Sequence, residues 1–145
     1  MKASSKARYS LRLAMDIALF ECDGPVSLSE VSRRQGISLK YLEQLATALT
    51  RKGYLKSVRG QAGGYLLACP PSQITAGDII RAAEGGFISV SCLEDDAALC
   101  PLERSCGSAS FWSGLHSAID TYLDSVALDQ LMQKPLTVND PALDC

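Results

Sequence analysis

Three cysteines lie close together in an acidic segment past the middle of the 145-residue chain. Seven residues separate Cys92 from Cys100, and five separate Cys100 from Cys106. Thiolates are preferred ligands of zinc and of iron–sulfur clusters. The acidic neighbours are Glu94, Asp95, Asp96 and Glu103. Because these carboxylates disfavour bare thiolates and a bound cationic centre favours them, the segment predicts a metal or cluster site. The alternative is three buried structural cysteines.

The composition supports a thiol or metal role rather than a disulfide framework. A hydrophobic content of 47% is enough for one compact domain with a core. The chain contains no apolar run long enough to span a membrane, and its first residues lack the apolar centre of a signal peptide. We therefore expect a cytoplasmic protein without membrane contact, in a compartment that keeps its six cysteines reduced.

Charge divides the chain into two unlike halves. Residues 1–69 carry eleven Lys or Arg against five Asp or Glu, whereas residues 70–145 carry three against eleven. The first half can therefore attract phosphate and the second half repels it. Chance clustering of charges on solvated faces is the alternative interpretation.

The first half has the pattern of a helix-turn-helix. An amphipathic helix is expected over residues 9–22, with Arg8, Arg12 and Asp16 away from its apolar stripe. Ser27 has the capping-box spacing that begins a second helix, which ends at Gly36 with its arginines, 33 and 34, facing outward. A third helix is expected over residues 39–52 after a short turn, the arrangement of a helix-turn-helix.

A β-hairpin and two further helices follow in the predicted order. Residues 54–58 and 65–68 alternate like two strands around a glycine-rich loop, and a hairpin at this position is a wing. A helix is expected over residues 74–84, with Thr75 as its cap. The apolar spacing over residues 109–132 predicts one long helix, which in so small a protein should pack against its copy in a dimer.

The third helix would enter the major groove of DNA by its first turns. The candidate DNA-contacting residues there are Ser38, Lys40, Tyr41, Glu43 and Gln44. Gln44 can pair with adenine, Lys40 can reach guanine or phosphate, and Ser38 suits a phosphate at the helix N-terminus. Glu43 repels phosphate and accepts only from the cytosine amino group, so it would mainly reject wrong sequences. An ordinary solvated helix is the alternative.

The wing loop adds two candidate contacts. Arg59 could insert into the minor groove, and Gly60 would bring the backbone close to a phosphate. An ordinary hairpin loop would look similar. The position of the loop directly after the recognition helix favours the DNA-binding interpretation.

With these residues in place, the chain resembles the Rrf2 family of bacterial winged-helix regulators, and most closely its iron–sulfur cluster regulators. The resemblance covers residues 1 to about 133. It rests on the strings SKARY at 5–9, QGISL at 35–39, YLEQL at 41–45, SVRG at 57–60 and GGYLL at 63–67. It implies a homodimer joined through the C-terminal helix, with Cys92, Cys100 and Cys106 holding a cluster, in first place a two-iron two-sulfur cluster. Five residues match the family's DNA-contacting region: Tyr41, Glu43, Gln44, Arg59 and Gly60.

The fourth cluster ligand departs from the family pattern. The iron–sulfur cluster regulators have a histidine three residues past the third cysteine, where this chain has Ala109. The nitric-oxide-sensing members use an aspartate from the partner's first helix, where this chain has Arg8. The open candidates are Glu103, Asp95, Asp96, Glu94 and Glu43. The single histidine, His116, is expected to have a surface or dimer-packing role.

The sequence thus predicts a mainly α protein with a small β-hairpin wing, a winged helix-turn-helix followed by a long C-terminal dimerisation helix. The expected parts are a DNA-binding domain over 1–84, a cluster-binding loop over 85–108, the dimerisation helix over 109–133 and a flexible tail over 134–145. The expected function is a homodimeric regulator, not an enzyme, that binds double-stranded operator DNA and senses an iron–sulfur cluster, controlling cluster biogenesis. A nitric-oxide-sensing, thiol or zinc repressor of the same fold, and a small iron–sulfur electron carrier, are the alternatives.

Overall fold

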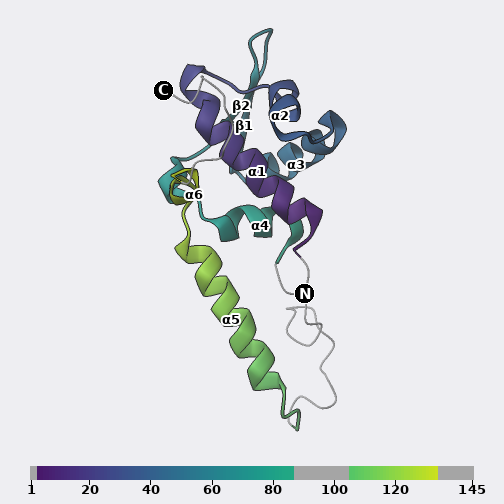
Figure 1. Ribbon diagram of the computed structural model, residues 1–145, viewed down its shortest axis with the longest axis vertical. Coiled ribbons are helices and arrows are strands. Elements are labelled where there is room, and N and C mark those ends of the chain that lie inside the picture. Colours follow the sequence, from purple (N-terminus) through teal and green to yellow (C-terminus); the bar gives the residue numbers. More distant parts are fainter. Residues whose placement is uncertain (1–2, 87–104, 134–145) are drawn as a thin grey trace.

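The fold consists of packed helices from which a hairpin and one long helix extend on opposite sides (Figure 1). A computed structural model describes residues 3–86 and 105–133. The elements are α1 Ser5–Phe20, η1 Glu21–Asp23, α2 Leu28–Gln35, α3 Leu39–Arg51, β1 Leu55–Val58, β2 Gly64–Leu67, η2 Pro71–Gln73, α4 Ala76–Glu84, α5 Ala109–Ser125 and α6 Leu128–Met132. The expected mainly α fold with a two-stranded wing is confirmed. Most of the expected cluster-binding loop and all of the expected tail lie outside the described residues.

The core forms where α1 meets α2, α3 and α4. Its fully buried large side chains include Leu13, Ile17, Val31, Leu42, Leu45, Leu49, Ile74, Ile79 and Leu128. Apolar residues repeat at helical spacing on α1 and α3, so each of these helices turns one stripe inward and leaves its other face to solvent. The core therefore fixes which face of α3 remains exposed.

Two capping boxes fix where α2 and α4 begin. The Ser27 hydroxyl accepts from the backbone N–H of Glu30, and the Glu30 carboxylate accepts from the backbone N–H of Ser27. Thr75 and Asp78 form the same pair at the start of α4. Gly36 ends α2 with a φ of 66°, a left-handed conformation that favours glycine. The helix-turn-helix geometry is thus set by local signals.

Asp16 and Arg34 were expected to face outward, but both side chains are buried. The side chain of Asp16 is only 1% exposed, and that of Arg34 is 8% exposed. Arg34 donates from Nε to both carboxylate oxygens at 3.1 Å and from Nη2 to Oδ1 at 2.6 Å. Gln35 Nε2 donates to Oδ2 at 2.8 Å. This buried ion pair ties α1 to the end of α2, immediately before the turn into α3.

The wing is anchored at its base to the start of the helix-turn-helix. In the antiparallel hairpin Leu55 pairs with Leu67 and Val58 with Gly64. Val26 and Tyr65 exchange two backbone hydrogen bonds of 2.9 and 2.8 Å, so the hairpin continues into the segment before α2. The wing therefore keeps a defined position relative to α2 and α3.

The single long helix expected over residues 109–132 is instead two helices, α5 and α6. The helix is interrupted at Val126, whose carbonyl accepts a hydrogen bond from Ala76 N–H at 2.8 Å. Two residues later, Leu128 N–H donates to the Ile74 carbonyl at 2.8 Å. Leu128 then enters the core with 0% exposure. These bonds to the chain before α4 take the place of helical hydrogen bonds. Among the described residues, no helix is long and apolar enough to cross a membrane.

Candidate DNA-binding surface and cysteine segment

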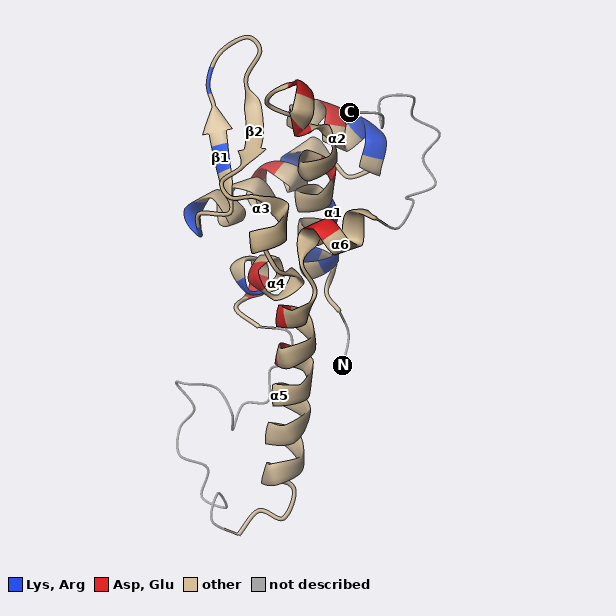
Figure 2. Cartoon of the chain, turned by 90° about the vertical axis from the view of Figure 1, so that its left-hand side faces the viewer, with Lys and Arg blue, Asp and Glu red and all other residues tan. Residues whose placement is uncertain are grey.

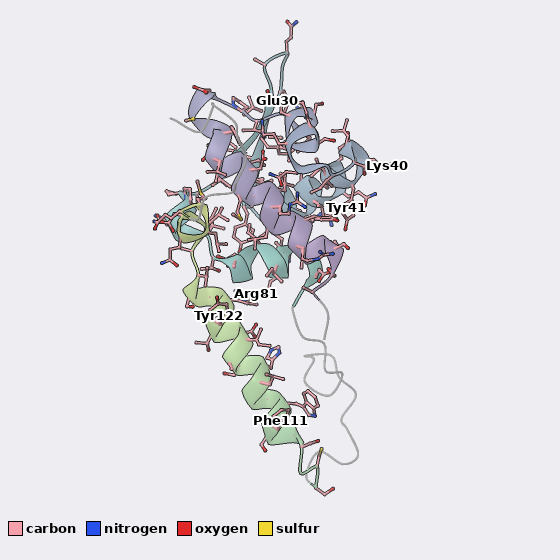
Figure 3. All side chains as sticks on the ribbon, in the orientation of Figure 1. Glu30, Lys40, Tyr41, Arg81, Phe111 and Tyr122 are labelled. Atoms are coloured by element: carbon pink, nitrogen blue, oxygen red, sulfur yellow. The ribbon has the colours of Figure 1, made fainter. Side chains whose placement is uncertain are left out.

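The exposed face of α3 brings together most of the predicted recognition residues. Lys40, Glu43 and Gln44 are exposed and line a shallow surface groove of about 400 Å³ with Thr47. Ser38, at the N-cap, is also exposed, and its side chain makes no capping hydrogen bond. The hydroxyl at the start of the helix is therefore available to a ligand. Figure 3 shows Lys40 and Tyr41 at the outer edge of the body, away from α5.

The expected residue Tyr41 is half-buried and belongs to a packed cluster. Its ring meets that of Tyr9 edge-to-face, with centroids 6.0 Å apart and an interplanar angle of 83°. The guanidinium groups of Arg8 and Arg12 each lie 5.5 Å from the centre of the Tyr9 ring. Arg12 also donates to the side chain and backbone carbonyl of Gln35, at 2.9 and 2.7 Å. Cations of α1 thus lie beside the first turn of the recognition helix.

The tip of the wing presents the predicted cation. Arg59 is exposed, and Gly60 follows it with a φ of +121°, a conformation that strains other residues. Gly63 N–H donates to the Gly60 carbonyl at 3.1 Å and closes the loop. A β-carbon at Gly63 would lie 2.3 Å from the Val58 carbonyl oxygen, so the loop needs glycine there. The loop that carries Arg59 is consequently tight and exposes its backbone.

Charge is distributed as a DNA-binding end would require. Figure 2 shows Lys and Arg on the hairpin and at one end of α3, whereas α5 carries only acidic charge, at its end next to α4. Phosphate is therefore attracted to the wing and α3 rather than to α5.

Arg81 of α4 connects the DNA-binding end to α5. It forms a hydrogen-bonded ion pair with Asp124 and lies 3.8 Å from Asp120 of the same helix. The hydrogen bond to Asp124 raises the pKa of Arg81, against partial burial. His116 Nε2 lies 3.1 Å from an Asp120 carboxylate oxygen, so this histidine contacts its own helix. Figure 3 shows Arg81 beside the end of α5 that also carries Tyr122.

Asp78 continues this polar contact toward the wing. Tyr54, which precedes β1, donates its hydroxyl proton to Asp78 at 3.1 Å. Partial burial raises the pKa of Asp78, but the hydrogen bonds from Thr75 and Tyr54 and the charge of Arg81 outweigh it and leave the pKa below its usual value. Burial, followed by the bond to this carboxylate, raises the pKa of Tyr54. The carboxylate of α4 thus contacts groups leading to both α5 and the wing.

Cys106 is the only predicted cysteine ligand within the described residues. Its thiol is exposed and free, and its sulfur lies 3.3 Å from the Ser108 hydroxyl. The hydrogen bond with the Ser108 side chain, and then one with its backbone, lower the pKa of Cys106. Hydrogen bonds of this kind favour the thiolate, the form that binds metal. The environment of Cys106 therefore fits a metal or cluster ligand.

Among the other predicted cluster ligands, only Glu43 lies within the described residues. Six candidates lie outside the described residues: Cys92, Cys100, Glu94, Asp95, Asp96 and Glu103. Glu43 lies on α3, whereas Cys106 precedes α5 at the far end of the same chain (Figure 1). Within residues 3–86 and 105–133, no three metal-binding side chains come together. The described geometry thus places Lys40, Glu43 and Gln44 together on α3, and Cys106 is the one cysteine of the predicted cluster set that lies within the described residues.

Sequence reasoning missed Thr47 on this surface and the burial of Asp16 in α1. Thr47 lies in the α3 groove, seven residues after Lys40 and three after Gln44, a helical spacing that could have revealed it. Asp16 lies three residues after Leu13, at a buried position of the α1 stripe. A carboxylate at such a position signals a buried partner.

Comparison with known proteins gives a consistent result. The family model Rrf2, described as an iron-dependent transcriptional regulator, matches residues 3–134. The transcriptional regulator IscR of Aliivibrio salmonicida is 39% identical over 132 residues, which cover 91% of this chain and 77% of that protein. IscR of Yersinia pseudotuberculosis is 38% identical over 132 residues, which cover 91% of this chain and 79% of that protein.

Solved structures agree in fold as well as in sequence. CymR of B. subtilis, described as the global cysteine regulator, superposes with a TM-score of 0.75 at 38% identity, covering 93% of this chain and 98% of its own. T. potens IscR gives a TM-score of 0.73 at 38% identity, covering 92% and 87%. These relatives are regulators and not enzymes. The chain therefore belongs to the Rrf2 family of winged-helix transcriptional regulators.

Proposed function

We propose that this chain is an iron–sulfur-cluster-sensing regulator that binds double-stranded operator DNA as a homodimer. Cluster occupancy would switch the affinity or specificity of binding, and genes of cluster biogenesis are the targets that the sequence resemblance implies. One observation carries the proposal. An exposed recognition face with a wing lies at one end of the chain, and Cys106, a free and exposed cysteine, lies three residues before α5 at the other end.

In the proposed complex, α3 lies in the major groove. Lys40, Glu43 and Gln44 face base edges, with Gln44 pairing to adenine and Lys40 reaching guanine or phosphate. Ser38 contacts a phosphate at the helix N-terminus, and Tyr41 contacts the DNA backbone with the part of its ring that Tyr9 leaves exposed.

The wing completes the proposed interface. Arg59 enters the minor groove beside α3, and Gly60 lets the backbone approach a phosphate. The support is the exposure of Arg59 and the positive φ of Gly60.

The wing contact is tested by salt dependence. Arg59→Ala should weaken operator binding and reduce the slope of log K against log salt by roughly one counterion. Gln61→Ala, an uncharged change in the same exposed loop, should leave that slope unchanged. Equal slopes for wild type and Arg59→Ala would count against the wing contact.

A second copy is proposed to cover α5. No residue of α5 is buried in one chain, and the side chains of Phe111 and Tyr122 are 63% and 69% exposed. Large apolar side chains left exposed on a helix with no buried residue support an interface with a second copy. Tyr122→Glu should give a monomer in analytical ultracentrifugation, whereas Ser117→Glu on the same helix should remain a dimer. A Tyr122→Glu variant that stays dimeric would contradict this interface.

Cys92, Cys100 and Cys106 are the proposed cluster ligands. The lowered pKa and free thiol of Cys106 support its part in this set. A two-iron two-sulfur cluster, when bound, supplies a thiolate-ligated centre whose presence and oxidation state can be sensed. The fourth ligand is proposed to be Glu103, Asp95, Asp96 or Glu94 of the same segment, Glu43, or a residue of the other subunit.

The residues of α4 are proposed to carry the signal between the ends of the chain. A displacement of α5 reaches α4 through the ion pairs of Arg81, and α4 packs against α1 and α3. A coupling of about 1–3 kcal/mol is enough for such a switch. Glu43 is the candidate whose repulsion of DNA differs between the two forms.

A nitric-oxide-sensing, thiol or zinc regulator of the same fold is the second candidate. The likeness to CymR and the free thiol of Cys106 favour it. A small electron carrier is less well supported, because it would leave the exposed face of α3 without a role.

Chemical analysis of anaerobically purified protein separates these candidates. The proposal expects a coloured protein with stoichiometric iron and acid-labile sulfide. Cys106→Ser should lose the colour, whereas Cys69→Ser, which changes an exposed cysteine outside the segment, should keep it. A colourless dimer with stoichiometric zinc would exclude the cluster and support the zinc regulator.

A further inference from the structure

Four residues of α3 form one continuous strip of the groove described above. Glu43, Gln44 and Thr47 lie three, four and seven residues after Lys40 on the helix, so the four side chains share one face. The base-reading residues of a homeodomain recognition helix have this same spacing. The strip therefore extends two turns into the helix and ends at Thr47.

Thr47 differs from the other three in what it can offer. Its side chain is exposed, and its hydroxyl donates to the Glu43 carbonyl at 2.7 Å. That bond uses the only hydrogen-bond donor of the side chain. Lys40, Glu43 and Gln44 all carry polar ends, so the γ-methyl of Thr47 is the apolar element of the strip.

We infer that Thr47 determines specificity by packing its γ-methyl against the 5-methyl group of a thymine. The inference rests on the proposed insertion of α3 into the major groove. Thymine is the base that presents a methyl group there, and threonine methyls are among its apolar partners. Thr47 lies about 4.5 Å along the helix from Gln44 at 1.5 Å per residue. The thymine should therefore lie within one or two base pairs of the position that Gln44 reads.

The contact can be removed from either side without changing hydrogen bonds. Thr47→Ser keeps the hydroxyl and deletes the methyl, whereas Thr47→Val keeps a methyl and deletes the hydroxyl. Replacing thymine by uracil deletes only the methyl of the base. Thr47→Ser and the uracil replacement each remove one methyl, so a contact between the two methyls predicts that either of these two changes alone abolishes it.

The experiment starts from a DNA duplex that the wild-type protein enriches from a randomised pool. Dissociation constants are measured at fixed salt for duplexes in which each thymine is replaced in turn by uracil. At one position uracil should weaken wild-type binding about fourfold for each recognition helix engaged, the effect of burying one methyl-sized group. Thr47→Ser should weaken binding to the thymine duplex by the same factor and show no further loss with uracil. Thr47→Val should keep the preference for thymine.

Two results would overturn the inference, and they differ in meaning. If the loss of affinity from Thr47→Ser multiplies with the loss from uracil at every position, the two methyls do not meet. That result would leave the proposed operator binding standing. Failure of the wild-type protein to enrich any duplex would overturn the proposed function together with this contact. Thermal melts of the variants serve as the control that the exposed substitutions leave the fold unchanged.

Discussion

Asp16→Asn should destabilise the protein by about 3 kcal/mol, at the lower end of the range for breaking a buried ion pair. The substitution keeps the size of the side chain but removes a charge that is 1% exposed and accepts hydrogen bonds from Arg34 and Gln35. An asparagine oxygen can still accept, which sets the loss at this lower end. The guanidinium of Arg34, 8% exposed, is left without its counter-charge.

Urea denaturation at fixed protein concentration measures this loss. With an m-value of about 1.5 kcal/mol/M, a loss of 3 kcal/mol lowers the midpoint by roughly 2 M. Asp120→Asn is the matched control, because that carboxylate is 37% exposed and lies 3.8 Å from Arg81. An exposed pair of this kind contributes less than about 1 kcal/mol.

A double variant separates charge from packing. Asp16→Leu combined with Arg34→Met replaces the pair by apolar side chains and should recover most of the stability that Asp16→Asn loses. Operator binding by Asp16→Asn should also weaken, because Gln35 precedes the turn into α3. If Asp16→Asn lowers the free energy of unfolding no more than Asp120→Asn does, the buried pair does not hold α1 to α2.

Three further predictions test the wing, the start of α2 and the polar contact of α4. Gly64→Ala should lower the free energy of unfolding by about 1–3 kcal/mol and weaken operator binding, because a β-carbon there would lie 2.4 Å from the Val26 carbonyl oxygen. Gly86→Ala is the control and should leave stability unchanged, because a β-carbon there would meet no atom within 4 Å. Ser27→Ala should cost about 1 kcal/mol in thermal or urea unfolding, and Ser27→Thr should restore most of it. Asp78 has a lowered pKa, so its stabilisation is present above the usual aspartate pKa and disappears as pH falls through the lowered value. The free energy of unfolding of Asp78→Asn should therefore fall less steeply than that of the wild type as the pH is lowered. An unchanged pH dependence would contradict the assigned contacts of Asp78.

Local signals in the sequence were enough to predict the DNA-binding part of the fold. The capping box at Ser27, the glycine at position 36 and the Thr75 cap each act within one helical turn. The hairpin likewise follows from alternation on either side of a glycine-rich loop. These interactions depend on residues a few positions apart, so their spacing is visible in the chain itself.

Interactions between distant segments were not predictable in this way. Asp16 and Arg34 were expected to face outward, yet they are buried against each other across two helices. The break at Val126 depends on hydrogen bonds to residues near 75, about fifty positions earlier, while the apolar spacing of residues 109–132 continues through it. Helical periodicity identifies the buried side of a helix but not the partner that meets it.

Operator affinity with and without the cluster tests the central claim most directly. One anaerobic preparation is divided, one portion is stripped of iron by a chelator, and both are titrated with the enriched duplex at the same salt concentration. A coupling of about 1–3 kcal/mol predicts dissociation constants that differ by about fivefold or more. Equal constants for the loaded and stripped forms, with the dimer intact in both, would contradict a regulator that senses its cluster.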